Sequence, residues 1–260
     1  MPTTKIPRIT IVMPCFNGKK YLEKALEAFC SQDYSNKRLV IVDGKSTDGS
    51  HEIITKYAQN NPSVIWDQTS DTGISNAINI GLSYLDESDI FGYLGSDDML
   101  MPDILKTVSF MLNIAPDLDG VYFDCYNYFC DTKKMVYRKC PVTTFSLKNL
   151  LKLGTIAGLQ NIYIRGQYVL SNKFLETNRY SMDYELYLRL TKSGVENFMY
   201  IPQPSSVNFM NGNISTKYAI QGSLETIQAA ILHSGYTPEL IQRLIRLKLG
   251  QIKRSILRKS

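Results

Sequence analysis

Two adjacent aspartates, Asp97 and Asp98, are the residues whose type and spacing most directly imply chemistry. They follow the apolar run 91–94, which is typical of a short buried strand. Two ionised carboxylates side by side repel each other, so the pair needs a counter-charge, and a divalent cation is the usual one. A second interpretation is that the aspartates only cap the next helix, because Asp is a favoured N-cap residue. The pair therefore predicts either a cation site or a helix start.

Two further aspartates stand at comparable places in the pattern. Asp43 ends the apolar run 39–42, and Asp71 precedes a stretch of helical periodicity, 74–85. The carboxyl ends of parallel strands meet at one edge of a sheet, where such proteins bind their ligands. We therefore expect Asp43, Asp71 and the Asp97–Asp98 pair along one edge, with something cationic among them.

The elements that must position these acids alternate between strand and helix patterns. β-rich apolar runs predict strands at 9–14, 39–43, 64–66 and 91–94, with amphipathic helices between them. This alternation predicts an α/β fold with a mainly parallel central sheet. Beyond residue 112 the pattern is mixed, and the expected elements are a hairpin at 121–138, a strand at 162–165 and helices at 183–190 and 238–260. This second half is expected to build the site of a second substrate.

Bulk composition narrows the class of protein. The chain of 260 residues is 44% hydrophobic and 20% charged, which is ordinary for a folded domain. A formal net charge of +5 is mild and does not call for a nucleic-acid partner. The five cysteines form no C-x-x-C pair, so we expect free thiols and no zinc site. The N-terminus lacks an apolar signal stretch and no apolar run is long enough to span a bilayer, so cytoplasmic residence is expected.

Five segments, in order, resemble the motifs of the family 2 glycosyltransferases, which have the GT-A nucleotide-sugar-binding fold. They are ITIVMPCFNG (9–18), VIVDGKSTDGS (40–50), DTGISNAINIG (71–81), GYLGSDD (92–98) and DYELYLR (183–189). The resemblance covers roughly the first 215 residues. Each motif is weak alone, whereas all five in the right order identify the chain as a member of this family.

The resemblance implies an inverting, metal-dependent transfer of a sugar from a nucleotide donor, usually a UDP-sugar, to an acceptor hydroxyl, here in the synthesis of a surface polysaccharide. Asp97 and Asp98 would hold Mn²⁺ or Mg²⁺ against the diphosphate. Asp43 would accept a hydrogen bond from the nucleobase, and Asp71 would lie near the base or ribose. The full implied donor site is Pro14, Phe16, Asn17, Asp43, Asp71, Asn76, Ser96 and Asp97.

Inversion in one displacement needs a base on the acceptor side, because the attacking hydroxyl is neutral. Asp183 matches the family's catalytic aspartate. Glu185 is the alternative base, but two positions along a helix it points to a different face, so we expect a solvated or structural role for it. His51 and His233 are expected to be surface or packing residues.

Three departures from the family pattern leave a choice of function open. Gly95 stands where many relatives carry the first aspartate of the D-x-D strand, and Met182 replaces the acid before Asp183. Lys45 stands where serine is common, and either contacts a phosphate or faces water. A catalytically degenerate nucleotide-sugar-binding scaffold subunit is therefore the alternative function. A nucleotidyltransferase is disfavoured, because the turn after the first strand holds one glycine (Gly18) for a triphosphate.

The expected organisation is a GT-A domain at 1–215, with a nucleotide-sugar half (1–112) and an acceptor half (113–215), followed by a helical extension at 216–260. The stretch 238–260 is a basic amphipathic helix with no acid after Glu239. It either packs its apolar stripe on the body or lies on an anionic membrane. The second interpretation fits a lipid-linked sugar acceptor and a peripheral position on the inner face of the membrane.

Overall fold

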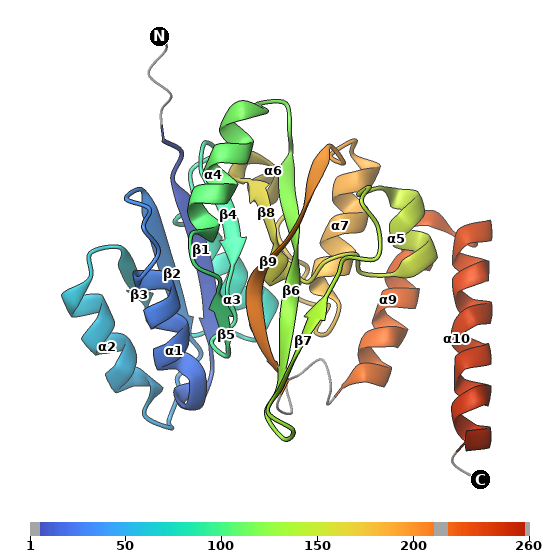
Figure 1. The fold of residues 1–260 in the computed structure, drawn as a ribbon, viewed down its shortest axis with the longest axis horizontal. Helices are drawn as coiled ribbons and strands as arrows, with labels where there is room; N and C mark the ends of the chain where they lie inside the picture. The colour runs from blue at the N-terminus through green and yellow to red at the C-terminus, as the bar shows by residue number, and fades with distance from the viewer. Residues whose placement is uncertain (1–5, 211–217, 258–260) are drawn as a thin grey trace.

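The structure is a computed structural model that describes residues 6–210 and 218–257. Its centre is a nine-stranded sheet in the order β3-β2-β1-β4-β8-β6-β9-β5, with β7 paired to β6 (Figure 1). The first half alternates strand and helix: β1 (Ile9–Cys15), α1 (Lys19–Cys30), β2 (Lys37–Asp43), α2 (Ser50–Asn60), β3 (Val64–Asp67), α3 (Ile74–Leu82) and β4 (Ile90–Tyr93). These four strands are parallel, so the predicted α/β fold with a parallel centre is confirmed.

The second half is mixed, as expected. It contains β5 (Asp98–Leu100), α4 (Ile104–Ile114), β6 (Gly120–Phe129), β7 (Lys134–Arg138), α5 (Leu147–Leu153), a 3-10 turn (Leu159–Asn161), β8 (Ile162–Arg165), α6 (Gly166–Ser171), α7 (Met182–Lys192), β9 (Phe198–Met210), α9 (Ala219–Ser234) and α10 (Pro238–Leu257). Strands β6 and β8 are antiparallel, and β9 runs parallel to β6 and antiparallel to β5. The sheet therefore continues without a break from the parallel strands into the mixed region.

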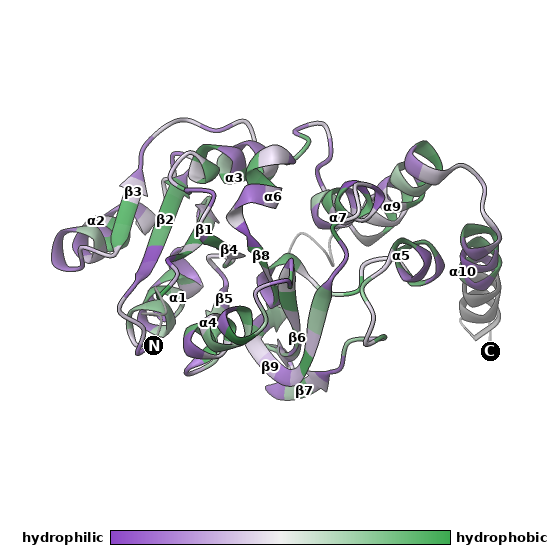
Figure 2. Ribbon diagram, turned by 90° about the horizontal axis from the view of Figure 1, so that it is seen from above, coloured by the Kyte–Doolittle hydropathy of each residue, from purple (hydrophilic) through white to green (hydrophobic). Residues whose placement is uncertain are grey.

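Alternate residues of β1 serve two different cores, one on each face of the sheet. Ile11 and Met13 pack in the core that includes α1 and α4, while Val12 packs in the core that includes α3. Figure 2 shows this layering from above, with α1 and α4 on one side of the strands and α3 and α6 on the other. Gly81 lets α3 approach β1, since a Cβ there would lie 2.4 Å from Cγ1 of Val12. Burial on both faces explains why β1 reads as a continuous apolar run.

The long strand β9 has no counterpart among the predicted elements. Its sequence carries two prolines, which remove ladder donors and argue against a central strand. In the structure Pro204 pairs with Asp124 between two register shifts of the β6–β9 ladder, so the proline lies at a bulge. The short strand β5 was also unexpected, because the sequence after Asp98 has a helical pattern.

Candidate active site

The donor-side acids lie where β1 and β2 end, and local hydrogen bonds fix them. Asp43, the last residue of β2, is only 4% exposed. Ser46, three residues on, donates its hydroxyl to Oδ1 of Asp43 over 2.5 Å, and the backbone N–H of Asn17 donates to Oγ of Ser46 over 2.8 Å. The turns after β1 and β2 are thereby joined. The role of Ser46 was missed from the sequence, although a hydroxyl three residues after an aspartate is a common turn partner.

Phe16 and Asp71 lie over the backbone of Gly44 at this edge of the sheet. A Cβ built on Gly44 would lie 2.9 Å from Oδ2 of Asp71 and 3.3 Å from the Phe16 ring, so both side chains lie directly against the backbone of this glycine. The Phe16 ring is 69% exposed, and Oδ1 of Asp71 accepts the N–H of Gly73 over 2.9 Å. An exposed aromatic face beside a carboxylate suits a flat ring that carries N–H donors.

The remaining residues of the implied donor site lie nearby, and the side chains of Asn17 and Asn76 hydrogen-bond to other parts of the protein. Asn17 accepts the N–H of Thr47 over 2.9 Å, and its own φ is +52°. Asn76 accepts the N–H of Thr72 and donates to Glu176. Pro14 is half-buried in β1, Lys45 is exposed, and Ser96 lies against Gly18. Both asparagine side chains thus have protein partners in this structure.

Asp97 and Asp98 both turn back over Gly95. A Cβ on Gly95 would lie 2.9 Å from Oδ1 of Asp97 and 2.8 Å from Oδ2 of Asp98, so the glycine leaves no room for the aspartate found in relatives unless the two carboxylates move. The interpretation of this pair as a helix cap is wrong, because Asp98 opens β5 and α4 begins only at Ile104 after Asp103.

Burial makes this acid pair electrostatically unfavourable as it stands. It raises the pKa of Asp97. The pKa of Asp98 is raised well above its usual range, first by burial and then by the charge of Asp97. A hydrogen bond from the N–H of Phe209 acts in the opposite direction and lowers this pKa. A divalent cation would relieve both effects, and carboxylate oxygens suit Mg²⁺ and Mn²⁺. In the ranges 6–210 and 218–257 no cluster of three His, Cys, Asp or Glu side chains is placed to bind a metal. The pair therefore fits a cation that takes its other ligands from outside the protein.

Asp183 lies in the first turn of α7 and lines a cleft of about 390 Å³. Its Oδ1 accepts the N–H of Tyr184 over 2.7 Å. Burial raises the pKa of Asp183 to about 6, against hydrogen bonds from the backbone of Tyr184 and Asp183 that lower it. The other residues of the cleft are Thr155, Tyr180, Ser181, Tyr218, Gly222, Ser223 and Thr226. A carboxyl group in this range suits a general base near neutral pH.

The pKa of one phenol, Tyr93, depends on both Asp183 and the Asp97–Asp98 pair. Tyr93, at the end of β4, is buried, and its pKa is raised first by burial and then by the charges of Asp98, Asp97 and Asp183. The charges of all three carboxylates therefore raise the pKa of the same hydroxyl group.

Glu185 is structural, which is one of the two roles expected for it, and its side chain is not solvated. It is 3% exposed, and Arg189 binds it in a bidentate pair, with Nε–Oε1 at 2.8 Å and Nη2–Oε2 at 2.9 Å. His233 of α9 lies 3.0 Å from the same carboxylate, which makes it the packing residue expected. His51 is exposed and meets Trp66 edge-on, with ring centroids 4.5 Å apart.

The start of α10 packs on the body of the protein. Leu240 is fully buried, and Nη1 of Arg243 donates to the hydroxyl of Tyr184 over 3.1 Å. Side chains 249–260, which include Ile252, Lys253, Arg254, Ile256, Arg258 and Lys259 of the predicted basic stripe, lie outside the described residues. No helix within the described ranges is both long enough and apolar enough to cross a bilayer.

The sheet with its acids at one edge and a separate carboxylate in a cleft has the architecture of the GT-A fold. The chain matches the model of glycosyl transferase family 2 over residues 10–175, well over half of its length, and it belongs to that family. Asp183 and α9 lie beyond the matched stretch. An uncharacterized glycosyltransferase of Haemophilus influenzae is 29% identical over 206 residues, which are 77% of this chain and 78% of that protein.

Solved structures share the fold at low sequence identity. The S. aureus TarS 1–349 complex with UDP-GlcNAc superposes with a TM-score of 0.69 at 15% identity, over 91% of this chain and 71% of that one. The mannosyltransferase PcManGT of Pyrobaculum calidifontis, in complex with GDP-Man and Mn²⁺, gives 0.66 at 18% identity over 94% and 70%. Several curated relatives are longer than this chain. Glycosyltransferase GlyA of Streptococcus pneumoniae serotype 4 is 30% identical over 39% of this chain, and the match covers 14% of GlyA. The match to an uncharacterized glycosyltransferase of Rickettsia typhi covers 60% of that protein.

Proposed function

We propose that this protein transfers a sugar from a nucleotide-sugar donor, a UDP-sugar, to an acceptor hydroxyl with inversion, in the synthesis of a surface polysaccharide. The observation that carries the proposal is Asp183, a carboxyl group with a pKa of about 6 that lines a cleft and whose charge, like those of Asp97 and Asp98, raises the pKa of Tyr93. Relatives support the donor class: TarS was solved with UDP-GlcNAc, and chondroitin and hyaluronan synthases of Pasteurella multocida are each 24% identical to this chain over 204 residues.

The nucleotide is assigned to the surface formed by Phe16, Gly44 and Asp71, with its base against Phe16 and Pro14 and its N–H groups toward Asp43 and Asp71. Asn17, Asn76 and Ser96 support this side of the site. Asp97 and Asp98 would hold Mn²⁺ or Mg²⁺, which would neutralise charge on the diphosphate leaving group. In this scheme residues 1–112 bind the donor, 113–215 bind the acceptor, and 216–260 form a helical extension.

Asp183 removes the proton from the attacking hydroxyl group. The acceptor oxygen forms a bond to the anomeric carbon as the bond from that carbon to the diphosphate oxygen breaks. The proton goes to Asp183, and the electron pair of the broken bond goes to the diphosphate. A positioned base of this kind contributes roughly 10²–10⁴-fold. Only the ionised carboxylate accepts the proton, so turnover is expected to fall as the pH drops below about 6.

The test compares the wild-type protein with Asp183→Asn, using a panel of UDP-sugars and sugar acceptors. We expect turnover to fall about 10²–10⁴-fold while UDP affinity by calorimetry stays the same, because the amide keeps the shape but not the basicity. Asp131→Asn, on the exposed hairpin turn, is the matched control. Unchanged turnover in Asp183→Asn would remove it as the base.

The same calorimetry tests the cation and the alternative function. UDP binding is expected to weaken with a chelator and to recover with Mn²⁺ or Mg²⁺, and Asp97→Ala should abolish this dependence. Equal UDP affinity with and without chelator would contradict the metal assignment. Nucleotide-sugar binding without transfer or hydrolysis of any donor would instead support the scaffold alternative.

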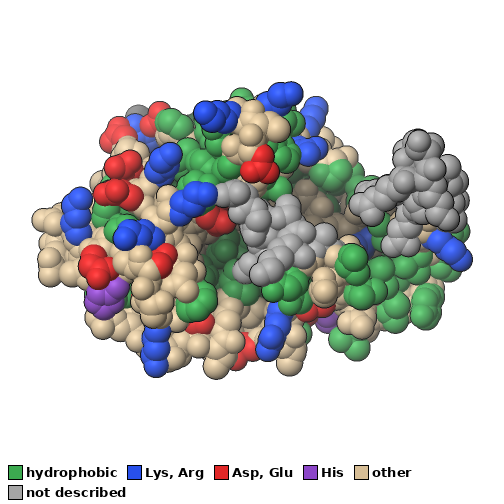
Figure 3. Space-filling view, turned by 90° about the horizontal axis from the view of Figure 1, so that it is seen from below, with side chains coloured by type: hydrophobic (Ala, Val, Ile, Leu, Met, Phe, Trp, Pro, Cys, Tyr) green, Lys and Arg blue, Asp and Glu red, His purple; other side chains and the backbone are tan. Residues whose placement is uncertain are grey.

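We further propose that the α9–α10 end contacts an anionic membrane, where a lipid-linked acceptor would lie. Hydrophobic side chains gather at this end of the molecule, at the right of the view from below in Figure 3. Those exposed on the two helices and their connection are Ile220, Leu224, Leu232, Tyr236, Ile241, Ile245 and Leu247. Arg246 and Lys248 beside them are exposed, and each basic residue near an anionic surface contributes about 1 kcal/mol.

Vesicle co-sedimentation tests the membrane contact. We expect binding to phosphatidylserine-containing vesicles that weakens with salt, little binding to phosphatidylcholine alone, and a loss in the double variant Arg246→Glu/Lys248→Glu. Equal sedimentation of the wild type and this variant would contradict the proposal.

A further inference from the structure

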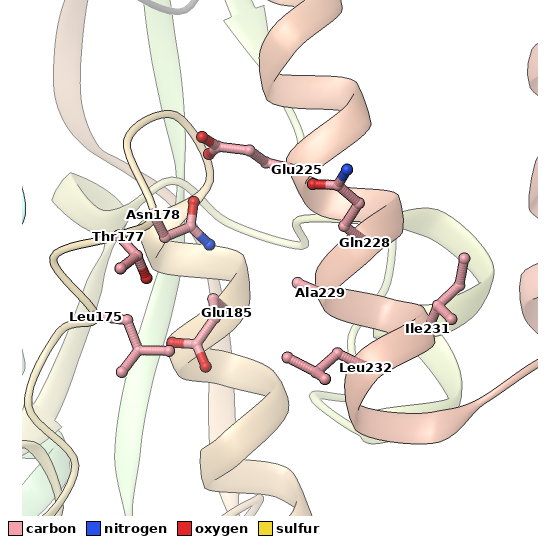
Figure 4. Close-up of a pocket in the computed structure, with 9 residues that line it drawn as sticks. All are labelled: Leu175, Thr177, Asn178, Glu185, Glu225, Gln228, Ala229, Ile231 and Leu232. Carbon is pink, nitrogen blue, oxygen red and sulfur yellow. The ribbon is translucent and has the colours of Figure 1, made fainter.

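Glu225, on α9, receives three backbone hydrogen bonds from consecutive residues of a distant segment. The N–H of Arg179 donates to Oε1 over 3.2 Å, and those of Tyr180 and Ser181 donate to Oε2 over 2.7 and 3.1 Å. In Figure 4 Glu225 points from α9 toward the loop that carries Asn178. One carboxylate thus satisfies three donors at once, an arrangement stronger than bonds between neutral groups.

The segment held by Glu225 leads directly into the helix that carries Asp183. Ser181 is the N-cap residue of α7, and its own side chain makes no capping bond to the helix. Asp183 follows two residues later in the first turn. The position of the 179–181 backbone therefore sets where α7 begins and where the Asp183 carboxylate points.

Separate contacts also seat α9 against this segment. A Cβ on Gly222 would lie 3.4 Å from Cβ of Tyr180, and the Tyr180 and Tyr218 rings have centroids 4.9 Å apart. Thr226, which follows Glu225, is 7% exposed and lines the Asp183 cleft. Helix α9 is therefore both a wall of the cleft and the anchor of the segment that presents the base.

We propose that Glu225 is a positioning residue for the transfer reaction: it holds residues 179–181 so that Asp183 meets the acceptor hydroxyl. This inference rests on the proposed role of Asp183 as the base. Glu225 touches no reacting atom and acts through the backbone. Without its carboxylate, the N–H groups of Arg179 and Tyr180 lose this partner, and that of Ser181 keeps only Oδ1 of Asn178 at 3.3 Å. The start of α7 can then shift, and a misplacement of about 1 Å can cost roughly 10²-fold in rate.

The experiment replaces Glu225 with glutamine in the full chain. The amide keeps the volume but offers one acceptor oxygen in place of two and adds N–H donors that face N–H donors. We expect kcat to fall about 10- to 100-fold, with UDP affinity by calorimetry within twofold of wild type. Gln228→Ala is the matched control, since Gln228 lies about one turn from Glu225 on α9 and is exposed. Both side chains line the pocket drawn in Figure 4, which is separate from the Asp183 cleft. It should leave both quantities unchanged.

A double variant separates positioning from general damage. If Glu225 acts only through Asp183, Asp183→Asn/Glu225→Gln should be no slower than Asp183→Asn alone, because the two residues act as a unit. Three outcomes would overturn the positioning role. These are a further fall in the double variant, a kcat within twofold of wild type in Glu225→Gln, and a parallel loss of UDP binding in Glu225→Gln. Should Glu225→Gln fail to fold, Glu225→Asp serves instead: it keeps the carboxylate, shortens its reach, and should lose at least threefold in kcat with UDP affinity kept.

Failure of this inference differs from failure of the proposed function. Full activity in Asp183→Asn removes the base and with it the basis of the positioning role. Loss of activity in Asp183→Asn but not in Glu225→Gln overturns the role of Glu225 alone.

Discussion

The donor side and the acceptor side of the site hold their carboxylates in different ways. On the donor side three acids accept hydrogen bonds from neighbours in sequence: Asp43 from Ser46, Asp48 from Ser50 and Asp71 from Gly73. On the acceptor side the partners are distant, with Glu225 and Tyr180 separated by 45 positions and Glu185 and His233 by 48. The donor side is a set of local turns, whereas the acceptor side depends on the docking of α9 against α7.

This difference has energetic consequences. A local turn forms with little loss of chain entropy, and its loss changes one loop. A polar link between distant helices is buried, so removing one partner leaves the other without compensation. Substitutions of comparable chemistry should therefore cost more on the acceptor side than on the donor side.

The largest effect is expected from Glu185→Ala. The substitution leaves the guanidinium of Arg189 and the ring of His233 without the buried carboxylate that binds both. Breaking a buried pair in this way typically costs about 3–5 kcal/mol, and we expect the lower end because the Arg189 side chain is 20% exposed. Urea unfolding of the wild type and the variant measures the loss.

The matching control removes an exposed pair on the donor side. Asp33→Ala breaks the ion pair of Asp33 with Lys106, in which both side chains are open to water. Such pairs contribute little, and no measurable change in stability is expected. Equal losses in Glu185→Ala and Asp33→Ala would remove the energetic distinction between the two sides.

The same difference explains how much could be predicted from the sequence. Strands β1, β2 and β4 were predicted correctly because both of their faces are buried, and β3 was predicted although it is only half-buried. The position of Asp43 at the end of β2 was predicted because it directly follows such a buried run. The strand β9 was missed because Pro204 lies at a bulge that only the pairing with β6 reveals. Helix α9 lies within the helical extension expected at 216–260, but the role of Glu225 was missed because its partners lie far away in the chain, so no local spacing marks it.

Asp48 is a donor-side acid that supports the fold and is not part of the proposed ligand site. It belongs to the motif 40–50, yet its carboxylate is used by the fold: Oδ2 accepts the N–H of Lys19, the first residue of α1, and Oδ1 accepts the N–H of Ser50, the first residue of α2.

Asp48 is therefore a cap shared by two helices. Asp48→Ala should lower stability by about 1 kcal/mol, the usual cost of losing a cap, and so less than Glu185→Ala. Asp48→Asn should lose less, because its amide oxygen still accepts one of the two N–H groups while its amide nitrogen faces the other. Urea unfolding measures both losses, and calorimetry with UDP should show nearly unchanged affinity. A loss in Asp48→Ala as large as that in Glu185→Ala would mean that the local turns of the donor side are as costly to break as the long-range links of the acceptor side.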